Sequence, residues 1–140
     1  MNRILLAEAD ENFRKNLAWS LSRAGYEVVQ ASNGRAALEL LRHTAPSLVV
    51  TSVFLPDRDG LEVIREVRAQ LPGVPVVALS ASCKRCGYDA FDIALRLGAD
   101  RVLEKPVTSQ ALLKALMSLP FRQRQAGSGS VETTQRKDVA

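Results

Sequence analysis

Five short apolar runs divide this chain, and stretches with a helical repeat of apolar residues separate them. The runs predict β-strands over residues 3–7, 26–30, 48–53, 74–80 and 101–104. The third run is the most apolar: nearly every residue from Leu48 to Val53 is aliphatic or β-branched. It predicts a buried strand, and Pro56 and Gly60 indicate that a loop follows it.

Between the runs, apolar residues recur at spacings of three and four, as in helices that pack one face on a sheet. The first stripe is Phe13, Leu17 and Leu21, with Asp10 as a candidate N-cap and Gly25 as the stop. The others are Ala37, Leu38 and Leu41; Leu61, Ile64, Val67 and Leu71; a helix over about 89–97; and Leu112, Leu113, Leu116 and Met117, capped by Thr108 or Ser109.

Strands that alternate with helices in this way predict an α/β domain with a doubly wound parallel sheet. The carboxyl ends of the first, third, fourth and fifth strands then meet along one edge of the sheet. Ligands bind at this edge in open parallel sheets. It gathers six residues: Glu8, Ala9, Asp10, Ser52, Ser80 and Lys105.

Composition indicates a single folded domain over residues 1–120. The chain has 140 residues, of which 46% are hydrophobic and 24% charged, enough for one substantial core. Residues 121–140 are rich in Gln, Gly, Ser, Thr and charge. We predict that they form a disordered basic tail, because such a segment cannot bury enough apolar surface to offset its ordering entropy.

The charge and hydropathy of the chain exclude several classes of function. The net charge is +4, and the tail holds four basic and two acidic residues, so the folded part is only +2. That is too little to predict nucleic-acid binding. No apolar run is long enough to cross a membrane, and the amino terminus enters a strand without a signal-peptide pattern. We expect a cytoplasmic protein with reduced cysteines.

Five motifs together carry a resemblance to a known family. They are Arg3-Ile-Leu-Leu followed by acidic residues, Leu55-Pro56-Asp57-Arg58-Asp59-Gly60, Ala78-Leu79-Ser80-Ala81, Leu97-Gly98-Ala99-Asp100 and Glu104-Lys105-Pro106. In this order and spacing the chain resembles the receiver domain of bacterial response regulators over roughly residues 2–120. The resemblance implies a flavodoxin-like (βα)5 fold, a strand order of 2-1-3-4-5 and a cis Lys105-Pro106 peptide bond.

A working receiver of this family takes a phosphoryl group from a histidine kinase onto an aspartate. The chemistry requires a carboxylate nucleophile, Mg²⁺ held by carboxylates, and a hydroxyl and a lysine that bind the developing charge. By the resemblance, Ser52 stands at the acceptor position, Glu8 and Ala9 at the acidic pair, Ser80 at the hydroxyl position and Lys105 at the lysine position. The switch aromatic of the fifth strand is replaced by Val102.

Ser52 cannot replace the acceptor aspartate. A serine hydroxyl needs a general base, and its phosphate ester lacks the reactivity of an acyl phosphate. With two carboxylates gone, Mg²⁺ would lose its water ligands for poor compensation, so we expect neither a metal nor another cofactor. The sequence therefore predicts a degenerate pseudo-receiver, not an enzyme, that acts by protein–protein interaction in two-component signal transduction.

The expected partners are a histidine kinase, another receiver or a scaffold protein. The face made by the fourth helix, the fifth strand and the fifth helix, near Phe91, Ile93, Arg96 and Arg101, is the expected binding surface and a candidate homodimer interface. Lys105 itself needs a new partner, because a partly buried ammonium is costly without one. We predict an ion pair with Glu8 or Asp10.

Three alternatives stay open. The chain is an active phosphorelay response regulator if Glu8, Asp10 and another carboxylate hold Mg²⁺, or if Asp57 or Asp59, which we interpret as turn residues, accepts phosphate. It is an engineered variant of an ordinary regulator if Ala9 and Ser52 were introduced. Cys83 and Cys86, in a C-x-x-C spacing, would make it a thiol-based redox sensor or an intersubunit metal site.

Overall fold

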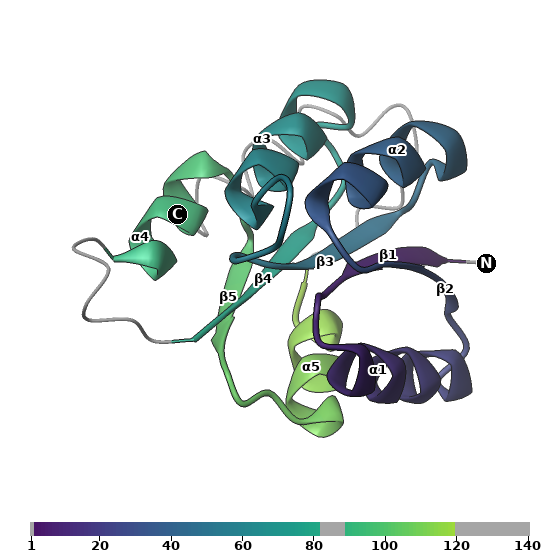
Figure 1. Ribbon diagram of the computed structural model, residues 1–140. Coiled ribbons are helices and arrows are strands. Elements are labelled where there is room, and N and C mark those ends of the chain that lie inside the picture. Colours follow the sequence, from purple (N-terminus) through teal and green to yellow (C-terminus); the bar gives the residue numbers. More distant parts are fainter. Residues whose placement is uncertain (1, 82–88, 120–140) are drawn as a thin grey trace.

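The computed structural model describes residues 2–81 and 89–119, and within these ranges it forms a parallel sheet covered by helices on both faces (Figure 1). The strand order is β2-β1-β3-β4-β5, as predicted. The strands are β1 (Arg3–Ala7), β2 (Glu27–Ala31), β3 (Leu48–Ser52), β4 (Val76–Ser80) and β5 (Arg101–Glu104). The flavodoxin-like (βα)5 architecture is therefore confirmed.

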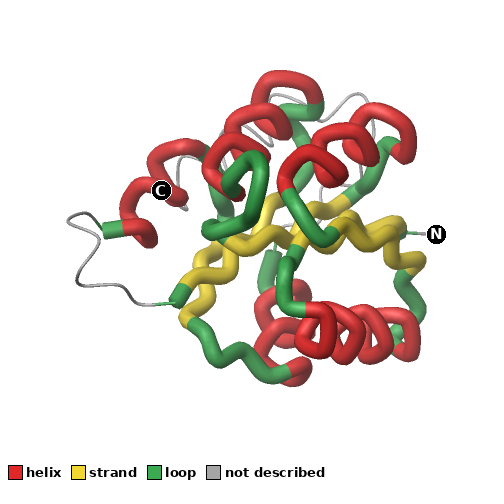
Figure 2. The backbone as a smooth tube through the Cα atoms, viewed as in Figure 1, coloured by secondary structure: helices red, strands yellow, loops and turns green. Residues whose placement is uncertain are grey.

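The helices divide into two layers. They are α1 (Glu11–Arg23), α2 (Gly34–Thr44), α3 (Gly60–Gln70), α4 (Ala90–Leu97) and α5 (Ser109–Met117). Figure 2 shows α1 and α5 on one face of the sheet and the other three on the opposite face. In β1, Leu5 and Ala7 pack beneath α2 and α3, whereas Ile4 and Leu6 pack beneath α1 and α5. Strand side chains alternate between faces, so a strand covered on both sides is apolar throughout.

Polar caps fix where the helices begin. The Asp10 side chain accepts a hydrogen bond from the backbone N–H of Phe13 at 3.0 Å, and Thr108 Oγ1 accepts one from Ala111 at the same distance. Asp10 was predicted as a cap, and of the two candidates for the last helix, Thr108 and Ser109, it is Thr108 that caps it. Asn33, Asp59 and Asp89 cap α2, α3 and α4 in the same way. Each cap satisfies a backbone donor that the first helical turn leaves without a partner.

Three strands differ from the prediction by one or two residues at their ends: β2 is shifted by one residue, β3 ends at Ser52 and not at Val53, and β4 begins two residues later. Strand β2 begins at Glu27 because the N–H of Tyr26 still bonds back to Leu21 O, at 3.1 Å, in the turn that ends α1. Strand β4 begins at Val76 and not at Val74, because Pro75 has no N–H to donate to a ladder. The predicted stop for α1, Gly25, follows the C-cap Ala24 and has φ +103°, which suits glycine.

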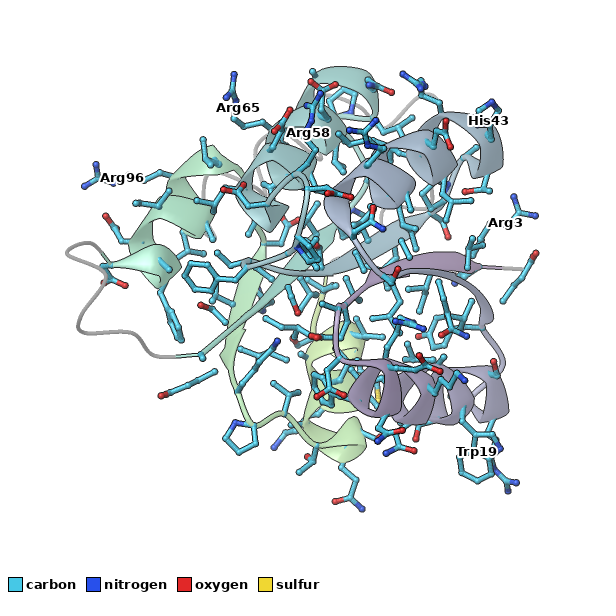
Figure 3. All side chains as sticks on the ribbon, in the orientation of Figure 1. Arg3, Trp19, His43, Arg58, Arg65 and Arg96 are labelled. Atoms are coloured by element: carbon cyan, nitrogen blue, oxygen red, sulfur yellow. The ribbon has the colours of Figure 1, made fainter. Side chains whose placement is uncertain are left out.

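Trp19 lies off the apolar stripe of α1 and is 63% exposed. Figure 3 shows it projecting from the side of α1 that faces away from the sheet. The Arg23 guanidinium lies 4.8 Å from the centre of its ring, a cation–π contact between neighbouring turns of the helix. The indole is therefore a surface group and not part of either core.

Three further predictions concern single segments of the chain. The Lys105-Pro106 peptide bond is cis, as the resemblance implied. No helix in residues 2–81 and 89–119 is long and apolar enough to cross a membrane. Cys83, Cys86 and the predicted tail over 121–140 lie outside the described residues, so the predictions about them stay predictions.

Candidate functional site

The carboxyl ends of β1, β3 and β5 bring three of the predicted site residues together. Glu8 directly follows β1, Ser52 ends β3 and Lys105 directly follows β5. The strand register makes the ends level, since Ala7 pairs with Thr51 and Ser80 with Glu104. The site is therefore built on the rigid ends of parallel strands, where ligands bind in folds of this kind.

The Glu8 carboxylate is the centre of this site and accepts three hydrogen bonds. Lys105 Nζ donates to Oε1 at 2.7 Å, and Ser52 Oγ donates to the same oxygen. The backbone N–H of Asp10 donates to Oε2 at 2.8 Å. Glu8 is 3% exposed and Ser52 fully buried, so the carboxylate is held by protein donors. Charge-assisted hydrogen bonds of this kind are among the stronger ones in proteins.

The predicted pair between Lys105 and a carboxylate is present, and Glu8 is its carboxylate. Sequence reasoning left Glu8 and Asp10 open as partners. Asp10 instead uses its side chain to cap α1 and contributes only its backbone N–H to the site. Because an Asp directly before a helix is a favoured N-cap, its carboxylate is committed to the helix terminus.

Two residues of α1 also belong to the site, although sequence reasoning assigned them no role there. Lys105 Nζ lies 5.5 Å from the centre of the Phe13 ring, within reach of a cation–π contact. Arg14 donates from Nη1 to the backbone carbonyl of Glu8 at 3.1 Å. Phe13 was assigned only to the apolar stripe of its helix. The sequence signal that could have placed Phe13 at the site is its position shortly after Glu8 and Asp10, at the start of the helix that follows β1.

Ser80 and Ala9 lie at the same edge but outside the network around Glu8. Ser80 is buried, and its hydroxyl donates to the neighbouring carbonyl of Ala81 at 3.1 Å. Its own carbonyl accepts from the backbone N–H of Lys105 at 2.9 Å. Ala9 is exposed and has no side-chain ligand atom. Ser80 therefore contributes to the site through its backbone, by anchoring the residue that carries the ammonium.

The loop after β3 turns back closely on Ser52. The N–H of Gly60 donates to Val53 O at 2.7 Å. A Cβ atom on Gly60 would lie 1.8 Å from the carbonyl oxygen of Ser52, far inside contact distance. Asp59 caps α3, and Asp57 sits in the loop with φ +71°, a left-handed conformation that Asp tolerates. Both lie in the turn, as their interpretation as turn residues expects.

The residues of the site do not fit a bound Mg²⁺ ion. Magnesium requires several oxygen ligands in near-octahedral geometry. Ala9 supplies none, Ser52 donates its hydroxyl to Glu8, and both oxygens of Glu8 accept hydrogen bonds from protein donors. Over residues 2–81 and 89–119, no group of three or more His, Cys, Asp or Glu side chains is arranged so that it could hold a metal ion.

Comparisons with known proteins agree on the type of domain. A family model described as "Response regulator receiver domain" matches residues 4–117. The chain is 38% identical over 121 residues to the response regulator MprA of Mycolicibacterium vanbaalenii, covering 84% of this chain and 49% of that protein. It is 34% identical over 120 residues to the alkaline phosphatase synthesis transcriptional regulatory protein PhoP of Bacillus subtilis, covering 82% and 48%. The chain thus spans about half the length of these curated relatives.

Solved structures show the same likeness. The chemotaxis response regulator CheY4 of Vibrio cholerae superposes with a TM-score of 0.74 at 27% identity, covering 84% of this chain and 97% of that one. The signal receiver domain of the response regulator NarL from Mycobacterium tuberculosis gives a TM-score of 0.72 at 30% identity, covering 83% and 93%. Sequence and structure therefore point to one family.

Proposed function

Because the chain belongs to the family of response regulator receiver domains, we propose that it is a two-component signalling module whose output does not depend on phosphorylation of an aspartate. Receiver domains are signalling domains and not typical enzymes, and they interact with histidine kinases and other partners. The proposal rests on the carboxyl edge of the sheet, where Ser52 stands at the position that the resemblance implies for the acceptor. We therefore place its function in protein binding alone.

One observation carries the proposal. The position where β3 ends holds a fully buried Ser52, and its hydroxyl donates to the carboxylate of Glu8. Glu8 also binds the ammonium of Lys105. A carboxylate that already accepts three hydrogen bonds, one of them from an ammonium, is a poor general base for a serine. The arrangement supports a structural role for Ser52 in place of phosphotransfer.

The partners that suit this proposal are a histidine kinase, another receiver or a scaffold protein. The face formed by α4, β5 and α5 is the surface we assign to them, and also to pairing with a second copy of the chain. Leu95 on α4 is 46% exposed and Met117 on α5 is 80% exposed. Exposed apolar side chains near charged ones, such as Arg96, suit a protein interface.

The test is phosphorylation by acetyl phosphate with Mg²⁺, measured by the intact mass of the protein. We expect this chain to keep its mass. A variant with Ala9→Asp and Ser52→Asp should gain about 80 Da, the mass of one phosphoryl group, because the two substitutions restore the nucleophile and one metal ligand. The lysine and hydroxyl positions, Lys105 and Ser80, are present in both proteins.

The matched control combines Ala9→Asp with Ser52→Asn. Asparagine has nearly the size of aspartate but no nucleophilic carboxylate, so this variant should not gain mass. A phosphoryl mass on the unmodified chain would contradict the proposal. Peptide mapping would then identify the acceptor and distinguish Ser52 from Asp57 and Asp59 in the loop before α3.

A further inference from the structure

We propose that the Lys105 ammonium is a built-in cation of the site, which replaces a bound metal ion and fastens the ends of β1, β3 and β5 to one another. The inference deepens the proposed function and rests on it, since it explains how a site without phosphotransfer keeps a single arrangement. Three properties of the site support it: its charge, the saturation of its carboxylate, and the segments that it connects.

The first property is charge balance. The side chains joined at the site carry one negative charge, on Glu8, and one positive charge, on Lys105, because Ser52 is neutral. Neighbouring Ala9 adds no charge. A divalent cation is held where several carboxylates leave an excess of negative charge. Here the charge of the single buried carboxylate is matched by a lysine of the same chain.

The second property is that both oxygens of the Glu8 carboxylate already accept hydrogen bonds from the protein. Oε1 of Glu8 accepts from Lys105 at 2.7 Å and from Ser52, and Oε2 accepts from the backbone of Asp10 at 2.8 Å. A metal ion could bind this carboxylate only by displacing Lys105. The ammonium would then lose its ion pair while 27% of its side chain is exposed, which is an unfavourable exchange.

The third property is the set of segments that the pair connects. Glu8 lies between β1 and α1, and its backbone is bonded to Ala31 at the end of β2 and to Arg14 of α1. Lys105 lies between β5 and α5, and its backbone N–H is bonded to Ser80 at the end of β4. One ion pair therefore links segments from opposite ends of the domain sequence, with the end of β3 attached through Ser52.

The consequence is a fixed arrangement of the strand ends at the site, and we call the contacts of Glu8 with Lys105 and Ser52 the lock. A site closed by its own lysine needs no ion from solution, and its arrangement does not change with the supply of Mg²⁺. A binding partner would meet the loops after β1, β3 and β5 in one fixed arrangement. The lock should therefore be observed as stability and local order that are independent of divalent cations.

The experiment is thermal unfolding followed by circular dichroism, with and without about 10 mM MgCl₂. The midpoint of this chain should move by less than about 1 °C on adding magnesium. Lys105→Met keeps an unbranched apolar side chain of similar length but removes the ammonium, and with it the cation–π contact with Phe13. It should lower the midpoint by about 5–10 °C, because a buried carboxylate loses its counter-charge.

Lys15→Met is the matched control. Lys15 pairs with Glu11 at 2.8 Å, a distance close to that of the Lys105 pair, but its side chain is 62% exposed and that of Glu11 66%. Exposed pairs contribute little because solvent screens them, so this midpoint should change by less than about 2 °C. An equal loss in both variants would overturn the inference.

Hydrogen exchange gives a readout that a general loss of stability does not reproduce. In Lys105→Met, the amide of Asp10 should exchange faster than in Lys15→Met under conditions where both are folded, because this amide donates to the carboxylate that Lys105 holds. Lys105→Arg, which keeps the cation, should restore much of the protection and also covers the case in which Lys105→Met does not fold. Unchanged exchange in Lys105→Met, or an unprotected Asp10 amide in Lys105→Arg, would contradict the lock.

These measurements fail independently of the test of function, because they use no phosphodonor. If this chain gains a phosphoryl mass but Lys105→Met gives the expected losses, the proposed function is wrong while the pair still orders the loops. If no mass is gained but magnesium raises the midpoint of this chain by several degrees, the site binds the metal and the built-in cation is wrong.

Discussion

Replacing Gly60 with alanine is expected to destabilise the domain by more than about 3 kcal/mol. The added Cβ would lie 1.8 Å from the carbonyl oxygen of Ser52 and 2.9 Å from the Cα of Val53. These are backbone atoms of a buried strand end and cannot move aside as a flexible side chain would. The free energy of unfolding, from urea titration followed by circular dichroism, measures the effect.

Gly25→Ala is the control for this substitution. Gly25 has φ +103°, which alanine adopts with strain. Among the described residues, apart from Gly25 and its two chain neighbours, no heavy atom lies within 4 Å of the position that an added Cβ would take. Its cost should be the conformational term alone, about 1 kcal/mol. If the two variants lose the same free energy, close packing against Ser52 does not explain the glycine at position 60.

Asp100→Ala should produce the second large loss, about 3–5 kcal/mol. The Asp100 side chain is 1% exposed, and its Oδ2 accepts from Val76 N at 2.8 Å and from Arg68 Nη2 at 3.0 Å. Arg68 also donates to the carbonyls of Gly98 and Pro72. The substitution removes the carboxylate that joins α3, the start of β4 and the turn before β5, and it removes a counter-charge of the partly buried guanidinium.

Asp92→Ala is the matched comparison, because Asp92 pairs with Arg96 at 2.9 Å across one turn of α4. The side chains of that pair are 51% and 78% exposed. Its loss should stay below about 0.5 kcal/mol, the range for exposed pairs. Urea denaturation of both variants measures the difference in the free energy of unfolding. If Asp100→Ala loses as little free energy as Asp92→Ala, the buried carboxylate of Asp100 does not stabilise the domain.

The fold was predictable because local signals and the global pattern agree in this chain. Apolar runs that alternate with helical stripes predicted the strands and helices. Residue type alone predicted the N-cap at Asp10 and narrowed the cap of α5 to Thr108 or Ser109. The boundaries at β2 and β4 were less predictable. The start of β2 depends on a hydrogen bond from Tyr26 back to Leu21, which an apolar run does not show. The start of β4 depends on the missing donor of Pro75, which is visible in the sequence although the apolar run extends past it.

The sequence predicted which strand ends meet at the site, but it did not predict most of the contacts or the parts played by Phe13 and Arg14. Parallel topology predicted that Glu8, Ser52 and Lys105 would gather at one edge, and the cost of an unpaired ammonium predicted an ion pair. The sequence did not show whether Glu8 or Asp10 would pair with Lys105. Asp10 caps α1 with its side chain, and Glu8 forms the ion pair. The ion pair between Arg68 and Asp100 was not predicted. The two residues are far apart in sequence, and no repeat of apolar or polar positions indicates that they meet.

The position of Trp19 decides what intrinsic fluorescence can report on this protein. It is the single tryptophan of the chain, and its indole is already 63% in contact with solvent. Unfolding would therefore change its emission only slightly, so the transition would have a small amplitude, and circular dichroism is the better signal for the losses expected above. A partner that covers the outer side of α1 would shift the emission to shorter wavelength. The same fluorophore that responds weakly to unfolding of the core is a local reporter of docking on the outer side of α1.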